Sequence, residues 1–164
     1  MFLSEHRQIH QNQQVLFMQK DVIISIYGLQ QQDDESGDPV TLVTTGHYAR
    51  RNGHYYVSYD ESALTGLEGT RTVVCVGPDR VLVTRTGSYP SQLVFERGRR
   101  HLSLYHTDYG DLSVCVSTQH IDNRLTDEGG LLDVRYQVEI DNTPTGVSHL
   151  KMDIKKANKG VAPQ

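Results

Sequence analysis

The sequence predicts an all-β protein that folds as a single antiparallel up-and-down β-barrel. Apolar and polar residues alternate with a period of two in many short runs, which is the pattern of strands with one buried face. Turn-forming residues separate these runs at short intervals, whereas parallel strands would need long crossover connections. No segment repeats apolar residues at the helical period over ten residues, and a helical turn is expected only at 62–68.

Strand-like runs follow one another from Asp21 onward. In the first run, Val22, Ile24 and Ile26 share one face, and a polar loop covers 30–39. Asn52-Gly53 is a strong signal for a hairpin turn between two of the later runs. Further strands are predicted near residues 40–50, 54–61, 70–77, 80–86, 91–97, 101–107, 111–121, 130–141 and 146–156.

The last two runs show the clearest alternation. In the first of them, five apolar residues fall on one face: Leu132, Val134, Tyr136, Val138 and Ile140. In the second, Leu150, Met152 and Ile154 are expected to face inward. About ten consecutive strands form a sheet that tends to close on itself, so the N- and C-terminal strands should be adjacent. A barrel of this size can leave room for one small ligand.

The two ends of the chain have a different composition. Residues 1–17 include a stretch rich in Gln and His and are assigned to an N-terminal arm, either disordered or helical. The barrel domain is assigned to 18–157, and 158–164 form a C-terminal tail.

Composition excludes several classes of partner. The net charge of -4 and the pI near 6.0 argue against nucleic acid and anionic membrane. The N-terminus has no apolar segment of signal-peptide length, and no run approaches the roughly 18 apolar residues of a membrane helix. Cys75 and Cys115 lie far apart within apolar runs and are expected to be buried free thiols. These features favour a cytoplasmic protein.

Three segments carry a resemblance to a known family. They are Tyr59-Asp60-Glu61, Val83-Thr84-Arg85-Thr86-Gly87 and Tyr105-His106-Thr107-Asp108-Tyr109-Gly110, followed in order by Thr118 and the closing strands 132–140 and 148–154. In these segments the chain resembles the YwiB-like family, bacterial proteins of unknown function with a lipocalin-like (calycin) barrel. The resemblance covers residues 21–154 and implies a fold, but no activity.

The strongest candidate site is polar and lies inside the predicted barrel. Arg85 is on the same strand face as Val81 and Val83, because the three residues alternate along one run. Glu61 ends an earlier run on the same face as Tyr59. The two charges could therefore meet near a barrel rim. Tyr105 and Thr107 share a phase on another strand and could add hydroxyl groups. Arg85 could then bind the acidic head of a ligand. The alternative is a structural Arg–Glu pair that ties strands together.

Other candidates have weaker patterns. The eight histidines show no metal-ligand spacing, so no metal or haem site is assigned, and His149 is expected to be solvated. The turn from Arg97 to His101 could grip phosphate but is more simply a solvated turn. No nucleophile elbow, phosphate loop or dinucleotide motif is present, so no catalytic residue and no cofactor are assigned.

The functional hypothesis is therefore a non-enzymatic cytoplasmic protein that binds a small, partly apolar ligand in its barrel. The alternative is a structural or protein-interaction module with a filled barrel, which could form a homodimer. A pocket volume below about 300 Å³ in the interior would favour the alternative.

Overall fold

The computed structural model describes residues 19–32, 35–36 and 38–157. The predicted N-terminal arm, 1–17, and the predicted tail, 158–164, lie outside the described residues.

The described chain consists almost wholly of strands, as the sequence predicted. Its only helical element is η1 (Ala63–Thr65), which falls within the helical turn expected at 62–68. No helix of the described part is long and apolar enough to cross a membrane. The strands are β1 (Lys20–Gln32), β2 (Glu35–Ser36), β3 (Val40–Arg51), β4 (His54–Asp60), β5 (Thr70–Val76), β6 (Arg80–Gly87), β7 (Ser91–Glu96), β8 (Arg100–Thr107), β9 (Gly110–Thr126), β10 (Gly129–Ile140) and β11 (Thr143–Lys156).

The strands form one antiparallel sheet in the order β7-β6-β5-β4-β3-β1-β11-β10-β9-β8, with the short β2 paired to β1. The N- and C-terminal strands are adjacent, because β1 pairs with β11 from Val22–Lys156 to Gln31–Val147. This pairing confirms the predicted up-and-down order.

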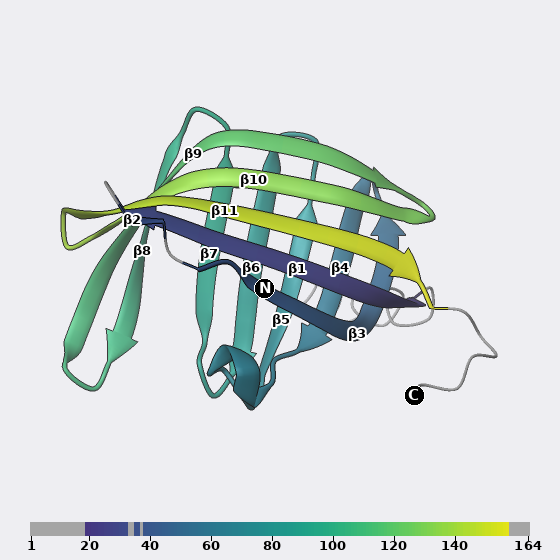
Figure 1. The fold of residues 1–164 in the computed structure, drawn as a ribbon, viewed down its shortest axis with the longest axis horizontal. Helices are drawn as coiled ribbons and strands as arrows, with labels where there is room; N and C mark the ends of the chain where they lie inside the picture. The colour runs from purple at the N-terminus through teal and green to yellow at the C-terminus, as the bar shows by residue number, and fades with distance from the viewer. Residues whose placement is uncertain (1–18, 33–34, 37, 158–164) are drawn as a thin grey trace, which may run out of the picture.

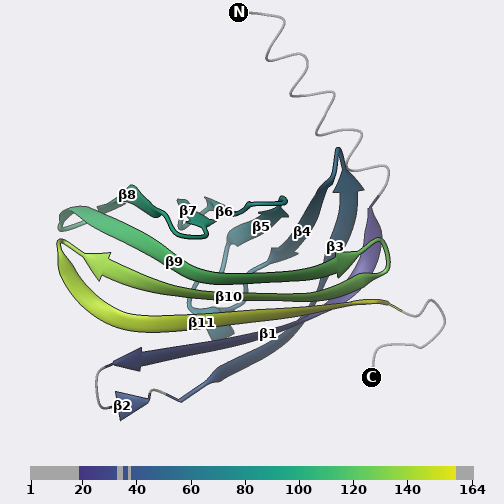
Figure 2. The same cartoon turned by 90° about the horizontal axis from the view of Figure 1, so that it is seen from above.

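The sheet is folded into two layers. The long strands β1, β11, β10 and β9 run across one layer, and β4 to β8 run steeply across them in the other (Figures 1 and 2). β3 bends from the first layer to the second (Figure 1). Gly46 on β3 allows the close approach at this corner, because a Cβ there would lie 2.3 Å from the Ser58 carbonyl oxygen and 2.6 Å from Cδ1 of Ile24.

The barrel is not fully closed, which corrects the predicted closure. β7 and β8 stand at the two ends of the hydrogen-bonded order and do not pair with each other. Instead, the backbone of Gly98 donates to the Thr118 carbonyl at 3.1 Å, and the Thr118 amide donates to the Arg99 carbonyl at 3.3 Å. Elsewhere along the seam, the Ser103 hydroxyl donates to the Gln92 carbonyl at 3.1 Å. The seam between β7 and β8 is therefore held by a few separate hydrogen bonds and not by the continuous pairing of two neighbouring strands.

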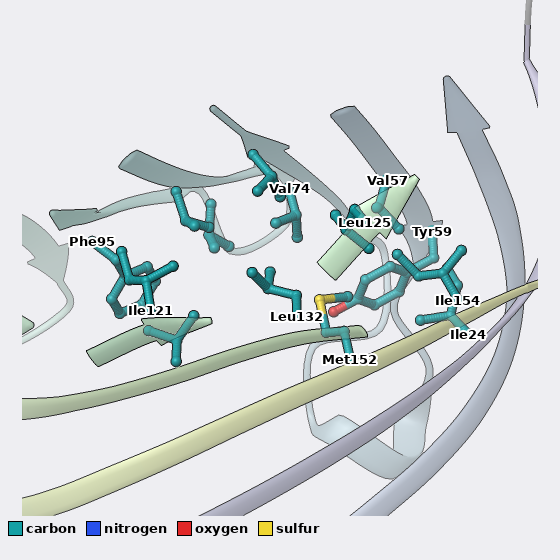
Figure 3. Packing of buried hydrophobic residues seen from close by; sticks show 14 of the residues in the cluster. Ile24, Val57, Tyr59, Val74, Phe95, Ile121, Leu125, Leu132, Met152 and Ile154 are labelled. Carbon is teal, nitrogen blue, oxygen red and sulfur yellow. The ribbon is translucent and has the colours of Figure 1, made fainter. Parts of the chain in front are cut away.

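The core lies between the two layers. Leu132 and Met152 from the long strands meet Val57 and Val74 from the short ones, and Phe95 lies beside Ile121 (Figure 3). At one end, the Tyr48 hydroxyl donates to the Thr126 carbonyl at 2.6 Å, and its ring stacks on Tyr55. Tyr48, Val22 and Ile24 are buried at the end of the barrel where β1 begins.

The opposite end of the interior is less completely covered. The apolar residues that pack against the core without being fully buried are Ile26, Tyr55, Leu93, Tyr105, Tyr136, Val138 and Leu150. Four of them, Ile26, Leu150, Tyr136 and Val138, lie toward the end of the interior where β1 ends and β11 begins, because β1 pairs with β11 and β11 pairs with β10. Gly28, which pairs with Leu150, has no described atom within 4 Å of where a Cβ would lie.

Candidate ligand-binding site in the barrel interior

Glu61 is a buried carboxylate with assigned partners. It directly follows β4, and its side chain is 3% exposed. Oε1 accepts a hydrogen bond from the Thr72 hydroxyl at 2.7 Å, and Oε2 accepts one from the Thr65 hydroxyl at 2.9 Å. A buried carboxylate needs such donors to replace its lost hydration. The pair of threonines therefore fixes Glu61 between β5 and η1.

Arg85 reaches the same place from β6. Val81 and Val83, which share its phase, are both buried, so the Arg85 side chain points into the barrel. Its Nε lies 3.9 Å from Glu61 Oε1, which is an ion pair but too long for a hydrogen bond. That Nε is buried and has no hydrogen-bond partner among the described residues. The predicted meeting of Arg85 and Glu61 is thus observed, with the guanidinium incompletely bonded.

Three tyrosines surround the Arg85 charge. Burial raises the pKa of Tyr59, Tyr105 and Tyr136, and the Arg85 charge lowers the pKa of all three in part. Tyr59 is on β4 and Tyr105 on β8, whereas Tyr136 is on β10 in the opposite layer, where its ring packs on Phe95. Arg85 therefore lies in the space between the two layers. Its surroundings combine phenol groups with apolar walls.

The buried Tyr59 phenol should make the fold sensitive to alkali. Burial, followed by the negative charge of Glu61, raises the pKa of Tyr59 from 10.0 to about 12. The folded state holds this proton more tightly, so the stabilisation is complete below pH 10 and is lost as the pH rises through 12. We expect the free energy of unfolding to fall by about 2 to 3 kcal/mol across this window.

Urea unfolding at a series of pH values, with tyrosinate absorbance followed in parallel, measures both quantities. In Tyr59→Phe, the free energy of unfolding should fall less between pH 10 and pH 12 than it does in the unmodified chain. An equal fall in the two proteins would show that Tyr59 is not its cause.

Thr107 does not join the group, contrary to the prediction. It is exposed at the hairpin between β8 and β9, where its hydroxyl donates to the Gly110 carbonyl at 2.6 Å and accepts from the Tyr109 amide at 3.2 Å. A shared strand phase places Tyr105 and Thr107 on one face, but only Tyr105 lies far enough from the turn to face the interior.

Sequence reasoning missed three members of the site. Thr65 and Thr72 bind the Glu61 carboxylate, and Tyr136 comes from the opposite layer. Thr72 had a usable signal, because it is in phase with the apolar residues Val74 and Val76 on β5. A threonine in an otherwise apolar inward row needs a hydrogen-bond partner.

A separate pocket of about 350 Å³ opens at the corner where β3 bends. Its lining includes Gly46 and Tyr59, and it is bordered by the ion pairs His47–Asp21 and Arg71–Asp60, each 3.3 Å long. Arg85, Glu61 and Tyr105 are not part of its lining. Tyr59 is therefore shared with the predicted site, while the polar residues at the border of the pocket pair with one another.

The other candidates are engaged in structural contacts. His149 is not solvated as expected, because its side chain is only 16% exposed and Nε2 lies 2.6 Å from Asp133. Arg97 donates to the Ile121 carbonyl, Arg100 pairs with Glu139, and Arg99 and His101 both pair with Glu96. The basic turn thus binds the protein's own groups around the seam. No group of three possible metal ligands occurs within the described ranges.

The two cysteines are free, as expected, but they are half-buried where full burial was predicted. Burial raises the pKa of the Cys75 thiol. Both residues lie on the outward phase of their strands, between buried neighbours.

A family model described as a domain of unknown function, DUF1934, matches residues 24–152, which is most of the chain. The chain belongs to the DUF1934 family. A protein similar to it is the uncharacterized beta-barrel protein YwiB of Bacillus subtilis (strain 168), with 28% identity over 109 residues, 66% of this chain and 75% of YwiB. The resemblance to YwiB-like proteins stated from the sequence is therefore confirmed.

A solved structure shows the same fold. The crystal structure of the ywiB protein from Bacillus subtilis aligns with a TM-score of 0.71 and 19% identity, over 85% of this chain and 94% of that one. At this identity the likeness shows the fold alone. Two of the segments that carried the resemblance, 59–61 and 83–87, meet at the Arg85–Glu61 pair in the present structure.

Proposed function

We propose that this chain is a binding protein that holds a small, partly apolar molecule inside its barrel. One observation carries the proposal: the end of the interior where β1 ends is lined by apolar side chains that are not fully buried. Two of the partly buried side chains, Tyr105 and Tyr136, lie near Arg85, whose charge lowers the pKa of both phenols in part. Apolar walls with a few polar anchors are typical of small-molecule sites.

Binding fits this group better than catalysis does. Both oxygens of Glu61 already accept hydrogen bonds from the hydroxyls of Thr72 and Thr65. The Glu61 carboxylate is therefore occupied by the protein's own donors and is not left free to act as a general base. The two free half-buried thiols are compatible with the reducing cytoplasm that the proposal assumes.

The proposal is tested by filling the open space beside Gly28. Gly28 is in phase with the inward residues Val22 and Ile24, and no described atom lies within 4 Å of the position that a Cβ would take. Gly28→Phe should place a ring in the interior without displacing the backbone, and aromatic residues suit strands. We expect it to reduce binding of the fluorescent probe 1-anilinonaphthalene-8-sulfonate at least tenfold.

Gly28→Ala is the matched control and should bind the probe like the unmodified chain. Circular dichroism and thermal melting should show that both variants keep the fold. Equal probe binding by the phenylalanine variant, with its fold intact, would place the probe outside the barrel and oppose the proposal.

An observation on the outer surface favours the alternative, a module that associates with a second copy of itself. Tyr56, Cys75, Leu82 and Val94 lie side by side across β4 to β7 and are all half-buried on the outward phase. The ion pairs Asp60–Arg71 and Arg80–Glu96 lie on the same strands, on opposite sides of this row. An apolar centre with a polar rim is typical of protein interfaces. Light scattering tests this alternative: the full chain should have the mass of a dimer, and the Leu82→Glu variant should have the mass of a monomer.

A further inference from the structure

Resting on the proposed binding function, we infer that the molecule held in the barrel is a monocarboxylate with an apolar tail, and that Arg85 binds its carboxylate. Three features of the site carry this inference: the unsatisfied donor of Arg85, the single charge that the site can accept, and the apolar walls beside it.

Arg85 has a hydrogen-bonding capacity that the described protein leaves partly unused. A guanidinium carries five N–H donors and is always charged. In this protein Nε is buried without a partner among the described residues, although Glu61 Oε1 is only 3.9 Å away. A buried donor left unbonded is unfavourable. A ligand oxygen that reached this donor would remove that cost.

Glu61 is held in a position that leaves the guanidinium available. Thr72 and Thr65 hold its two oxygens, at 2.7 and 2.9 Å, in an orientation that keeps the carboxylate near Arg85 without a hydrogen bond to Nε. Glu61 thus stabilises the buried guanidinium through charge while its planar donor fork can bind another group. That fork matches the two oxygens of a carboxylate.

The charge of the Arg85–Glu61 pair limits the charge that a ligand can carry. Glu61 already balances Arg85, so every ligand charge adds to a locally neutral pair in a poorly solvated place. One negative charge can be compensated by Arg85 and by phenol donors, whereas the second charge of a phosphate would face Glu61 directly. The hydroxyls of Tyr105 and Tyr136 can donate hydrogen bonds, and both residues lie near Arg85, whose charge lowers the pKa of each in part. Among anionic head groups, the site therefore favours a carboxylate over a phosphate.

The surroundings of the pair are apolar. Ile26 and Leu150 line one layer beside the open space at Gly28, and Leu93 lines the other, two residues along β7 from the partner of Arg85. These side chains are only partly buried in the described protein. An alkyl chain laid along them would remove apolar surface from water.

The experiment compares decanoate with 1-decanol by isothermal titration calorimetry on the full chain. The two probes share the tail and differ in the head group. We expect decanoate to bind at least tenfold more tightly than 1-decanol, as charge-assisted hydrogen bonds require. Arg85→Met should lose this preference. Arg85→Lys, which keeps the charge without the fork, should retain only part of it.

Arg71→Met is the matched control, because Arg71 is half-exposed on the outer surface and pairs with Asp60 at 3.3 Å. It should keep the full preference for decanoate. Thermal melting of each variant separates lost binding from lost folding. Equal affinities for the two probes in the unmodified chain would overturn the carboxylate inference and leave the binding function standing. No binding of either probe would overturn both.

Discussion

Replacing Gly46 with alanine is expected to destabilise the barrel by about 3 kcal/mol, the upper end of the usual range for overpacking. The added Cβ would lie 2.3 Å from the Ser58 carbonyl oxygen and 2.6 Å from Cδ1 of Ile24. The isoleucine can change its rotamer, but the carbonyl belongs to β4 and can move only with the backbone. Urea unfolding, followed by circular dichroism, measures the change.

Gly28→Ala is the control for this substitution. Gly28 is also a strand glycine on the inward phase, but no described atom lies within 4 Å of the added methyl group. Its stability should be unchanged or raised by up to about 1 kcal/mol, because alanine restricts the unfolded chain. Equal effects of the two substitutions would contradict the close approach of β3 and β4 at the corner.

Glu61→Ala is expected to cost about 3 kcal/mol, the lower end of the range for breaking a buried ion pair. The substitution leaves the Arg85 guanidinium without its counter-charge and removes the acceptor of the Thr65 and Thr72 hydroxyls. The lower end applies because the Arg85 side chain is 27% exposed and can reach some water. The free energy of unfolding in urea again provides the measurement.

The neighbouring carboxylate supplies a sharp control. Asp60 pairs with Arg71 at 3.3 Å, closer than Glu61 pairs with Arg85, but its side chain is 78% exposed. Surface pairs contribute little, so Asp60→Ala should cost less than about 1 kcal/mol. If the two alanine variants lost similar stability, burial of Glu61 would not be the cause of its effect.

Period-two alternation was enough to predict most of the fold, because each strand has one face in the core. It predicted the inward residues of β11 and most of those of β10, but Ile140, expected on the same face, is 37% exposed. It also predicted the adjacency of β1 and β11. It failed where the alternation changes phase. β9 was expected to end near residue 121 but continues to Thr126, and its register shifts opposite Arg135 and Tyr136. Beyond this bulge the inward residues are Ile121 and Leu125, on the opposite phase from Val116.

The open seam between β7 and β8 could not be predicted from the sequence. Both strands show ordinary alternation, and the turn between them is short, which favours a paired hairpin. Whether β7 and β8 pair through backbone hydrogen bonds depends on the curvature of the whole sheet, which in turn depends on features such as the corner at Gly46. The alternation of residues within each strand carries no information about this curvature.

The candidate site was predicted only in part, because alternation within a strand shows which face a residue is on but not where along the barrel it lies. Strand phase identified Arg85, Glu61, Tyr59 and Tyr105 as inward, and charge suggested the pairing that the structure shows. Phase did not indicate how deep along the barrel each residue lies, so Thr107 was included wrongly. Tyr136 was predicted to face inward, but its place opposite Arg85 depends on how the two layers cross.

Native mass spectrometry of the full chain, purified from the cells that naturally make it, tests most directly whether the barrel holds a small molecule. We expect a complex with one organic acid per chain, which gentle collisional activation releases, and which the Gly28→Phe variant from the same cells lacks. The bare mass of the chain, or the same adduct on the Gly28→Phe variant, would contradict a ligand held in the barrel interior.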